Sequence, residues 1–129
     1  MPAALVSQFI DAIERNDLDH ALTFLADDCE YDNVPIGKVV GPEAVRSMLV
    51  PFLDRYQEVQ WVVHHQTSSG DLTHGVVLNE RSDRFRTGDT WVELPVAGVF
   101  VVRDGRIALW RDYFDRDTLM QLLAQPVPE

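Results

Sequence analysis

The first half of the chain carries apolar residues at the three-to-four-residue spacing of amphipathic helices. Between residues 2 and 14 this spacing predicts a first helix that ends near Asn16. Asp17 or Asp19 can cap a second helix, which we expect to include Leu25. A short strand is then expected at residues 29–34.

A third helix is predicted to begin at Gly41-Pro42, because proline is tolerated at the first helical position and Glu43 suits the first turn. Pro51 should kink this helix or lengthen its inner side. The apolar residues of the helix form one stripe that we expect to be buried: Val45, Met48, Leu49, Phe52 and Leu53.

After Tyr56 the apolar spacing changes to every second residue, which is typical of half-buried strands. Four strands are expected, over residues 58–66, 73–85, 90–102 and 106–114. The breaks between them have turn composition, and Asp104-Gly105 is a strong signal for a two-residue hairpin. Consecutive hairpins favour an antiparallel meander.

A closing helix, capped by Asp115 or Asp117, should follow the last strand, and Pro126 and Pro128 should end the chain loosely. We therefore predict one α+β domain over residues 1–129. Its sheet is expected to be curved, mostly antiparallel and cone-like. The N-terminal helices would pack on the concave face of the sheet and enclose a pocket.

Composition narrows the class of partner. The net charge of -10 and the isoelectric point near 4.6 argue against nucleic acid or an anionic membrane surface as partners. No apolar run approaches membrane-spanning length, and the N-terminus lacks a signal-peptide pattern. Cys29 is the single cysteine, which fits a reducing compartment. We expect a cytoplasmic protein.

The second predicted strand carries charges where an apolar face is expected. Because strand side chains alternate, one face holds Val77, Asn79, Arg81, Asp83 and Phe85. If this face is inward, burial costs several kcal/mol per ion unless the ions are paired, and such a cost indicates a functional site. The alternative is a surface ion pair worth under about 1 kcal/mol.

Two further segments have the same character. Asp112 shares a strand face with Ala108, Trp110 and Phe114, and in the short strand Tyr31 and Asn33 share a face. Two carboxylates, an arginine, an amide and a phenol are therefore candidates for one pocket.

The histidines do not predict a metal site. His20 and His74 are expected to be exposed, and the adjacent His64 and His65 should point to opposite faces of one strand. Neighbours in a strand do not easily hold one metal ion, so we expect no metal.

Four segments together resemble the limonene-1,2-epoxide hydrolase family, whose cone-shaped fold is shared with ketosteroid isomerase and nuclear transport factor 2. They are Tyr31-Asp32-Asn33-Val34-Pro35, Asn79-Glu80-Arg81-Ser82-Asp83, Gly98-Val99-Phe100 and Trp110-Arg111-Asp112-Tyr113-Phe114-Asp115. The resemblance extends from the first helix to the region of Asp115. It implies an epoxide hydrolase that forms a homodimer through the outer face of its sheet, and a catalytic set of Asp83, Arg81, Asp112, Tyr31 and Asn33.

The chemistry of this set can be argued from its groups. Adding water to an epoxide to give a vicinal diol needs a base for the water and an acid for the leaving oxygen. Two carboxylates that share one proton supply both. The resemblance implies that Asp112 is the base and Asp83 the acid, and that Tyr31 and Asn33 hold the water. We expect one concerted step without a cofactor or a covalent intermediate.

The expected substrate is a small apolar epoxide, because the side chains that would line an open cone are apolar. They are Met48, Phe52, Phe85, Leu94, Trp110 and Phe114. The charged residues on the opposite strand faces, Asp32, Glu80, Arg84 and Arg111, should be solvated or interface charges.

Two other functions stay open on the same fold. A ketosteroid-isomerase-like or polyketide-cyclase-like enzyme would need one carboxylate base and an oxyanion hole, and an arginine between two aspartates argues against it. A non-catalytic ligand-binding module would leave the cost of the inward charges unexplained. Conversion of epoxides to diols would distinguish all three.

Overall fold

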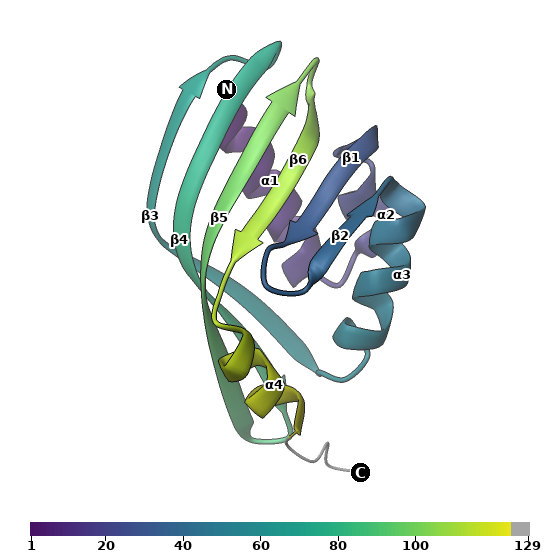
Figure 1. Ribbon diagram of the computed structural model, residues 1–129, viewed down its shortest axis with the longest axis vertical. Helices are drawn as coiled ribbons and strands as arrows, with labels where there is room; N and C mark the ends of the chain where they lie inside the picture. Colours follow the sequence, from purple (N-terminus) through teal and green to yellow (C-terminus); the bar gives the residue numbers. More distant parts are fainter. Residues whose placement is uncertain (125–129) are drawn as a thin grey trace.

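The computed structural model describes residues 1–124, in which a curved six-stranded sheet carries helices against it (Figure 1). The strands are β1 (Leu25–Asn33), β2 (Gly37–Val40), β3 (Glu58–Gly70), β4 (His74–Thr87), β5 (Thr90–Arg103) and β6 (Arg106–Tyr113). The helices are α1 (Pro2–Glu14), α2 (Leu18–Leu22), α3 (Pro42–Leu53) and α4 (Arg116–Ala124). The sheet order is β2-β1-β6-β5-β4-β3. The predicted α+β class is confirmed.

The meander from β3 to β6 is antiparallel throughout, as the turn signals predicted. Between β5 and β6, Asp104 and Gly105 both have positive φ, 51° and 78°, and Arg103 pairs with Arg106. Positive φ at both central residues is the requirement of the tight hairpin turn that Asp-Gly favours. By contrast β1 pairs with β6 in parallel, a contact that joins the two ends of the chain.

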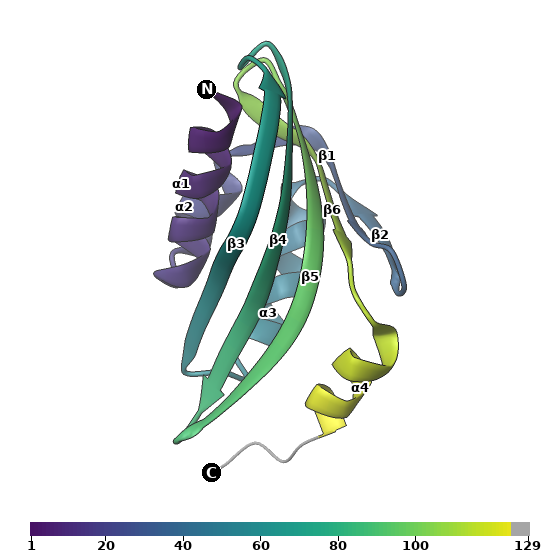
Figure 2. The same cartoon turned by 90° about the vertical axis from the view of Figure 1, so that its left-hand side faces the viewer.

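Helix α1 packs on β3 and β4 and defines the inner face of the sheet. Figure 2 shows α1 and α2 together on one side of the strands. Phe9 of α1 is fully buried, and its ring meets Trp61, Phe100 and Trp110 edge-on, with the Trp110 centroid at 5.1 Å. Burial and edge-on contact of these rings stabilise the packing of α1 on the sheet.

One expectation for the first half of the chain is wrong, and one strand was not expected. Helix α2 ends at Leu22, and Leu25 is the first residue of β1 rather than helical, because Ile107 of β6 pairs with it. Strand β2 was not predicted; its short hairpin with β1 places Gly37 opposite Asn33. Pro51 lies in the last turn of α3, which continues to Leu53, and the kink expected at this residue stays a prediction.

The two adjacent histidines do not point to opposite faces. A bulge between Val63 and His65 interrupts the alternation of β3. As a result His64 contacts Ser82 at 2.8 Å, while His65 is paired with Glu80, so both lie on the outer face.

Pro126 and Pro128, expected to end the chain loosely, lie outside the described residues.

Candidate functional site

The inner face of β4 is the one that strand alternation predicted. Its residues are almost completely buried: Val77, Asn79, Arg81, Asp83 and Phe85 are between 0% and 6% exposed. Glu80, on the other face, is exposed. Arg81 and Asp83 are therefore a buried ion pair and not a surface one.

Arg81 bridges two carboxylates from different strands. Its Nε donates to Asp83 Oδ1 at 2.7 Å, and its Nη2 donates to Asp83 Oδ2 at 3.3 Å and to Asp112 Oδ2 at 2.7 Å. The guanidinium also lies 4.7 Å from the centroid of the Trp61 ring. The planar fork of an arginine suits such a bridge, because its donors are fixed relative to one another.

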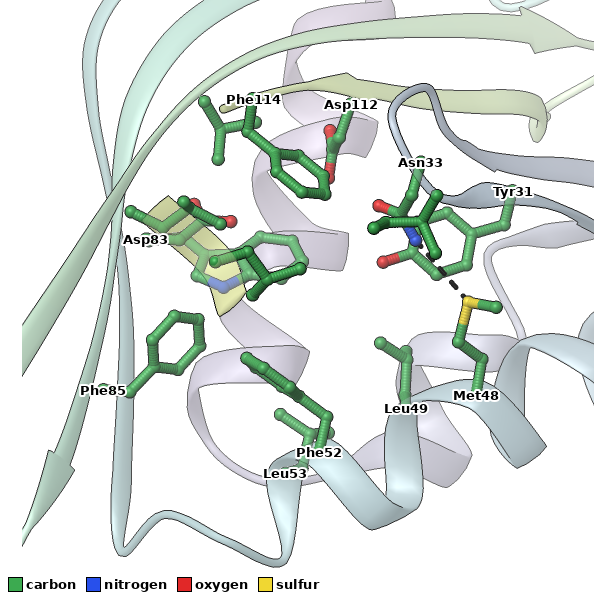
Figure 3. Close-up of a pocket in the computed structure, with 15 residues that line it drawn as sticks. Tyr31, Asn33, Met48, Leu49, Phe52, Leu53, Asp83, Phe85, Asp112 and Phe114 are labelled. Atoms are coloured by element: carbon green, nitrogen blue, oxygen red, sulfur yellow. Dashed lines mark hydrogen bonds between the residues drawn. The ribbon is translucent and has the colours of Figure 1, made fainter. Parts of the chain in front are cut away.

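The parallel pairing of β1 with β6 brings the remaining polar residues to the same place. Asn33 is paired with Asp112, and Tyr31 with Trp110, on which it stacks with centroids 3.8 Å apart. Asn33 Nδ2 is 3.5 Å from Met48 Sδ of α3. Tyr31, Asn33, Asp83 and Asp112 all line one pocket (Figure 3). The structure thus brings together all five residues of the expected polar set.

The walls of this pocket, which has a volume of about 190 Å³, are otherwise apolar. Five of the six expected wall residues line it: Met48, Phe52, Phe85, Leu94 and Phe114. Trp110 does not, which corrects the expectation. Its side chain is fully buried between Tyr31 and Phe9, so it supports the wall from behind.

Six wall residues were not among those expected: Ile36, Leu49, Leu53, Trp61, Val96 and Leu119. Signals for some of them exist in the sequence. Leu49 and Leu53 belong to the apolar stripe of α3, and Val96 is two residues from Leu94 on the same strand face. Nothing local in the sequence indicates that Leu119 of α4 reaches the pocket.

Burial controls the protonation of the two carboxylates. Removal from water raises the pKa of Asp83 to about 7; the charge of Arg81 opposes this and the charge of Asp112 adds to it. Burial likewise raises the pKa of Asp112 against the opposing effect of Arg81. One arginine cannot fully compensate two buried negative charges, so the pair favours a shared proton near neutral pH.

The other two ionisable groups have fixed protonation. Burial opposes the charge of Arg81, but Asp112 and Asp83 outweigh it and raise the pKa of the guanidinium, which stays charged. Burial, together with the charge of Asp112, raises the pKa of Tyr31 well above its usual range, so its hydroxyl stays protonated.

The two oxygens of Asp112 have different surroundings. Oδ2 accepts the bond from Arg81, whereas the buried Oδ1 accepts no hydrogen bond of ordinary geometry from residues 1–124, although the Trp110 side chain lies close enough to Asp112 to lower its pKa. An oxygen that accepts no bond from Arg81 keeps lone pairs for a proton, as a proton acceptor requires. Asp83 differs, because both of its oxygens accept from Arg81.

The remaining reactive side chains do not form a second site in the part of the chain that the structure describes. Within residues 1–124 there is no cluster of three or more His, Cys, Asp or Glu side chains that could hold a metal ion. Cys29 is buried, and burial raises the pKa of its thiol to about 12, which makes it a poor nucleophile. None of the helices in this part of the chain is long and apolar enough to cross a membrane.

Comparison with known proteins points to one family. A sequence model described as the limonene-1,2-epoxide hydrolase catalytic domain matches residues 1–125. The epoxide hydrolase EphG of Mycobacterium tuberculosis is 36% identical over 129 residues, which covers 95% of this chain and 83% of that protein.

Two solved structures are similar to this chain, the first in sequence and fold and the second in fold alone. An M. tuberculosis LEH-like epoxide hydrolase matches with a TM-score of 0.73 and 33% identity, over 92% of this chain and 85% of that one. A SnoaL-like polyketide cyclase from Shewanella putrefaciens matches with a TM-score of 0.78 over 93% of this chain and 83% of that one. Its identity is 18%, so it shows the fold alone.

Proposed function

The chain belongs to the limonene-1,2-epoxide hydrolase family and is an epoxide hydrolase, and we propose that Asp83 and Asp112 open a small apolar epoxide with water in one concerted step. One observation carries this mechanism: Arg81 binds both carboxylates at the wall of an apolar pocket. This arrangement holds an acid and a base next to the same substrate.

Asp112 is the base and Asp83 the acid in this proposal. Asp112 takes a proton from water, the water oxygen attacks one epoxide carbon, and Asp83 gives its proton to the oxygen released from that carbon. Asp112 Oδ1, which accepts no bond from Arg81, and the raised pKa of Asp83 support these roles. The diol leaves Asp112 protonated and Asp83 ionised, so the proton must return before the next turnover.

Tyr31 and Asn33 hold the water beside Asp112. Their support is the β1–β6 register, which pairs Asn33 with Asp112 and keeps both polar side chains at the pocket. The contact of Asn33 with Met48 restricts the amide from the α3 side. Holding the nucleophile in place removes much of the entropic cost of bringing water and epoxide together.

Two further parts of the proposal concern the oligomeric state and the cellular location of the enzyme. We expect a second copy of the chain as partner, bound through the outer face of the sheet. A cytoplasmic location is expected from the single cysteine and the acidic composition.

Turnover of a small panel of apolar epoxides tests the proposal. Each diol should form without added cofactor and at the same rate in EDTA, since side chains supply both proton transfers. Loss of turnover in EDTA that a metal restores would contradict the mechanism, and absence of any diol would contradict the proposed substrate class.

A further inference from the structure

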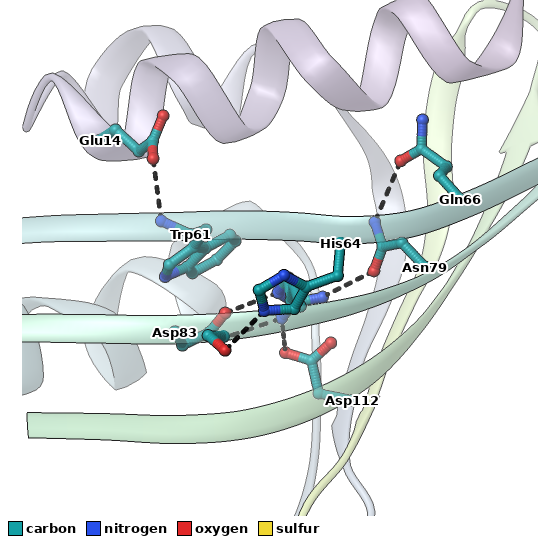
Figure 4. A network of polar contacts seen from close by, with 9 residues as sticks. Glu14, Trp61, His64, Gln66, Asn79, Asp83 and Asp112 are labelled. Carbon is teal, nitrogen blue, oxygen red and sulfur yellow. Dashed lines mark hydrogen bonds and ion pairs between the residues drawn. The ribbon is translucent and has the colours of Figure 1, made fainter.

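Arg81 makes one hydrogen bond that involves neither carboxylate. Its third nitrogen, Nη1, donates to Asn79 Oδ1 at 3.2 Å, and Asn79 Nδ2 in turn donates to Gln66 Oε1 at 3.3 Å (Figure 4). The bond to Gln66 fixes which end of the Asn79 amide faces the arginine. The neutral amide oxygen of Asn79 thus accepts from Nη1, the guanidinium nitrogen that does not bind an aspartate.

Gly98 of β5 lies on the other side of this contact. It is paired with Asn79 on β4 and with Asp112 on β6. A Cβ at Gly98 would overlap Arg81 Nη1 and would lie 2.9 Å from Asn79 Oδ1 and 3.2 Å from Asp112 Oδ1. The φ of Gly98 is not positive, so close approach of these side chains, and not backbone conformation, requires the glycine.

We propose that Asn79 and Gly98 form a seat for Arg81 and are positioning residues for epoxide opening. The inference rests on the proposed function and extends it to two residues that do not themselves transfer a proton. Two aspartates alone leave the guanidinium free to shift within its plane toward one of them. The amide of Asn79 and the backbone of Gly98, which has no side chain, fix the position of the guanidinium within this plane. They thereby fix the distance of the positive charge from each carboxylate.

The neutrality of Asn79 is part of the argument. Among residues 1–124, Arg81 is the one cation that forms ion pairs with Asp83 and Asp112. A third carboxylate at the seat would compete for the same positive charge and raise the pKa of both catalytic carboxyls. An asparagine binds Nη1 without this competition.

Gly98→Ala tests the geometric half of the proposal. The atoms that the new methyl group meets are side-chain ends, so the guanidinium must move and the strand need not. A displacement of this size should lower kcat by about a hundredfold. The KM for an apolar epoxide should change much less, because the apolar wall is untouched.

Val77→Ala is the matched control. Val77 is fully buried on the same face of β4, two residues from Asn79, and does not line the pocket. Its truncation lowers stability by leaving a cavity, and kcat should stay near the wild-type value. The two variants are compared at a temperature where both are folded. If Gly98→Ala then lowers kcat no more than Val77→Ala does, the seat has a structural role alone and the proposal is wrong.

Asn79→Asp tests the electrostatic half and does not depend on whether Gly98→Ala folds. A base that must be ionised and an acid that must be protonated give a bell-shaped pH–rate profile. The substitution keeps the shape of the side chain and the oxygen that accepts from Arg81 but adds a negative charge, so both limbs of this profile should move to higher pH. Asn79→Ala removes the acceptor without adding charge and should lower kcat without an alkaline shift of this size. An unshifted profile for Asn79→Asp would overturn the proposal.

Carbon-13 NMR titration of the aspartate carboxyls tests the role of the seat without a measurement of turnover. The carboxyls of Asp83 and Asp112, assigned by their Asn variants, should titrate at higher pH in Asn79→Asp than in the wild type. If the wild-type enzyme makes diol by another mechanism but this shift is present, the proposed mechanism fails and the seat stands. If the mechanism holds but neither titration nor profile moves, the seat is wrong and the mechanism stands.

Discussion

Asp83 and Asp112 differ from Asp32 and Glu80 by the side of the sheet that they occupy. The first two are at most 5% exposed and bound to Arg81. Asp32 pairs with Arg111 at 2.9 Å on the outer face, and Glu80 is exposed. Strand alternation alone predicts this division.

If Asp83 and Asp112 are the acid and base, replacing either by its amide should lower kcat far more than the same change at Asp32 or Glu80 on the opposite strand faces. Asp83→Asn and Asp112→Asn should each lower kcat by at least about a hundredfold, the usual worth of a general acid or base. The double variant should be scarcely worse than either single one, because groups that serve one step are not additive. Steady-state kinetics on one good epoxide measures this.

The controls are Asp32→Asn and Glu80→Gln, which should keep most of the activity. If either control abolishes turnover while Asp83→Asn or Asp112→Asn is mild, the catalytic roles have been assigned to the wrong face of the sheet.

Trp110 shows where reasoning from single residues fails. Its strand face was predicted correctly, but a face contains both pocket walls and deeper core positions. Tyr31, from a strand distant in sequence, covers the Trp110 ring and takes the wall position. No feature of the sequence around Trp110 predicts that cover.

At the scale of elements, local signals were sufficient for the meander and for α1. The turns with Gly and Asp, and the period-two spacing, fix β3 to β6 because hairpin partners are close in sequence. Asn16, with φ of 58°, ends α1 where the apolar periodicity stops. The predictable part of the fold is thus the part made by local contacts.

The parallel pairing of β1 with β6 could not be predicted in this way. It joins strands at opposite ends of the chain, and its register decides whether Tyr31 and Asn33 face Asp112. A slip of one residue would turn both side chains to the outer face. The local pattern made these two residues candidates for the pocket, and only the family resemblance gave them a role beside Asp112.

Strand β2 and the bulge in β3 were missed for related reasons. Four residues, Gly37–Val40, are too few to show a period, and the strand is defined by its pairing with β1. The bulge at His64 leaves no mark in composition, although it moves two histidines to one face.

At the scale of the whole molecule, the outer face of the sheet carries an apolar cluster that is left partly exposed by the residues that the structure describes. Leu78 is 44% exposed and is paired with Val99, while Val76 beside it is paired with Val101. An antiparallel sheet with one face on helices needs a polar or covered second face. A second copy of the chain, bound through this cluster, would provide the cover.

Sedimentation should therefore show a dimer at micromolar protein. Leu78→Arg, which places a charge in the middle of the cluster, should shift the protein toward monomer while Glu80→Gln, two residues further along the same face, should not. A wild-type protein that sediments as monomer alone would contradict the expected homodimer.

The central claim is that water, and no side chain, attacks the epoxide, and a single turnover in heavy-oxygen water tests it most directly. With enzyme in excess, the first diol should carry one heavy oxygen and the protein should carry none. An ester mechanism would instead put an unlabelled carboxylate oxygen into that diol and leave the label in Asp83 or Asp112. That result would make one of these residues a nucleophile and contradict the concerted acid–base account.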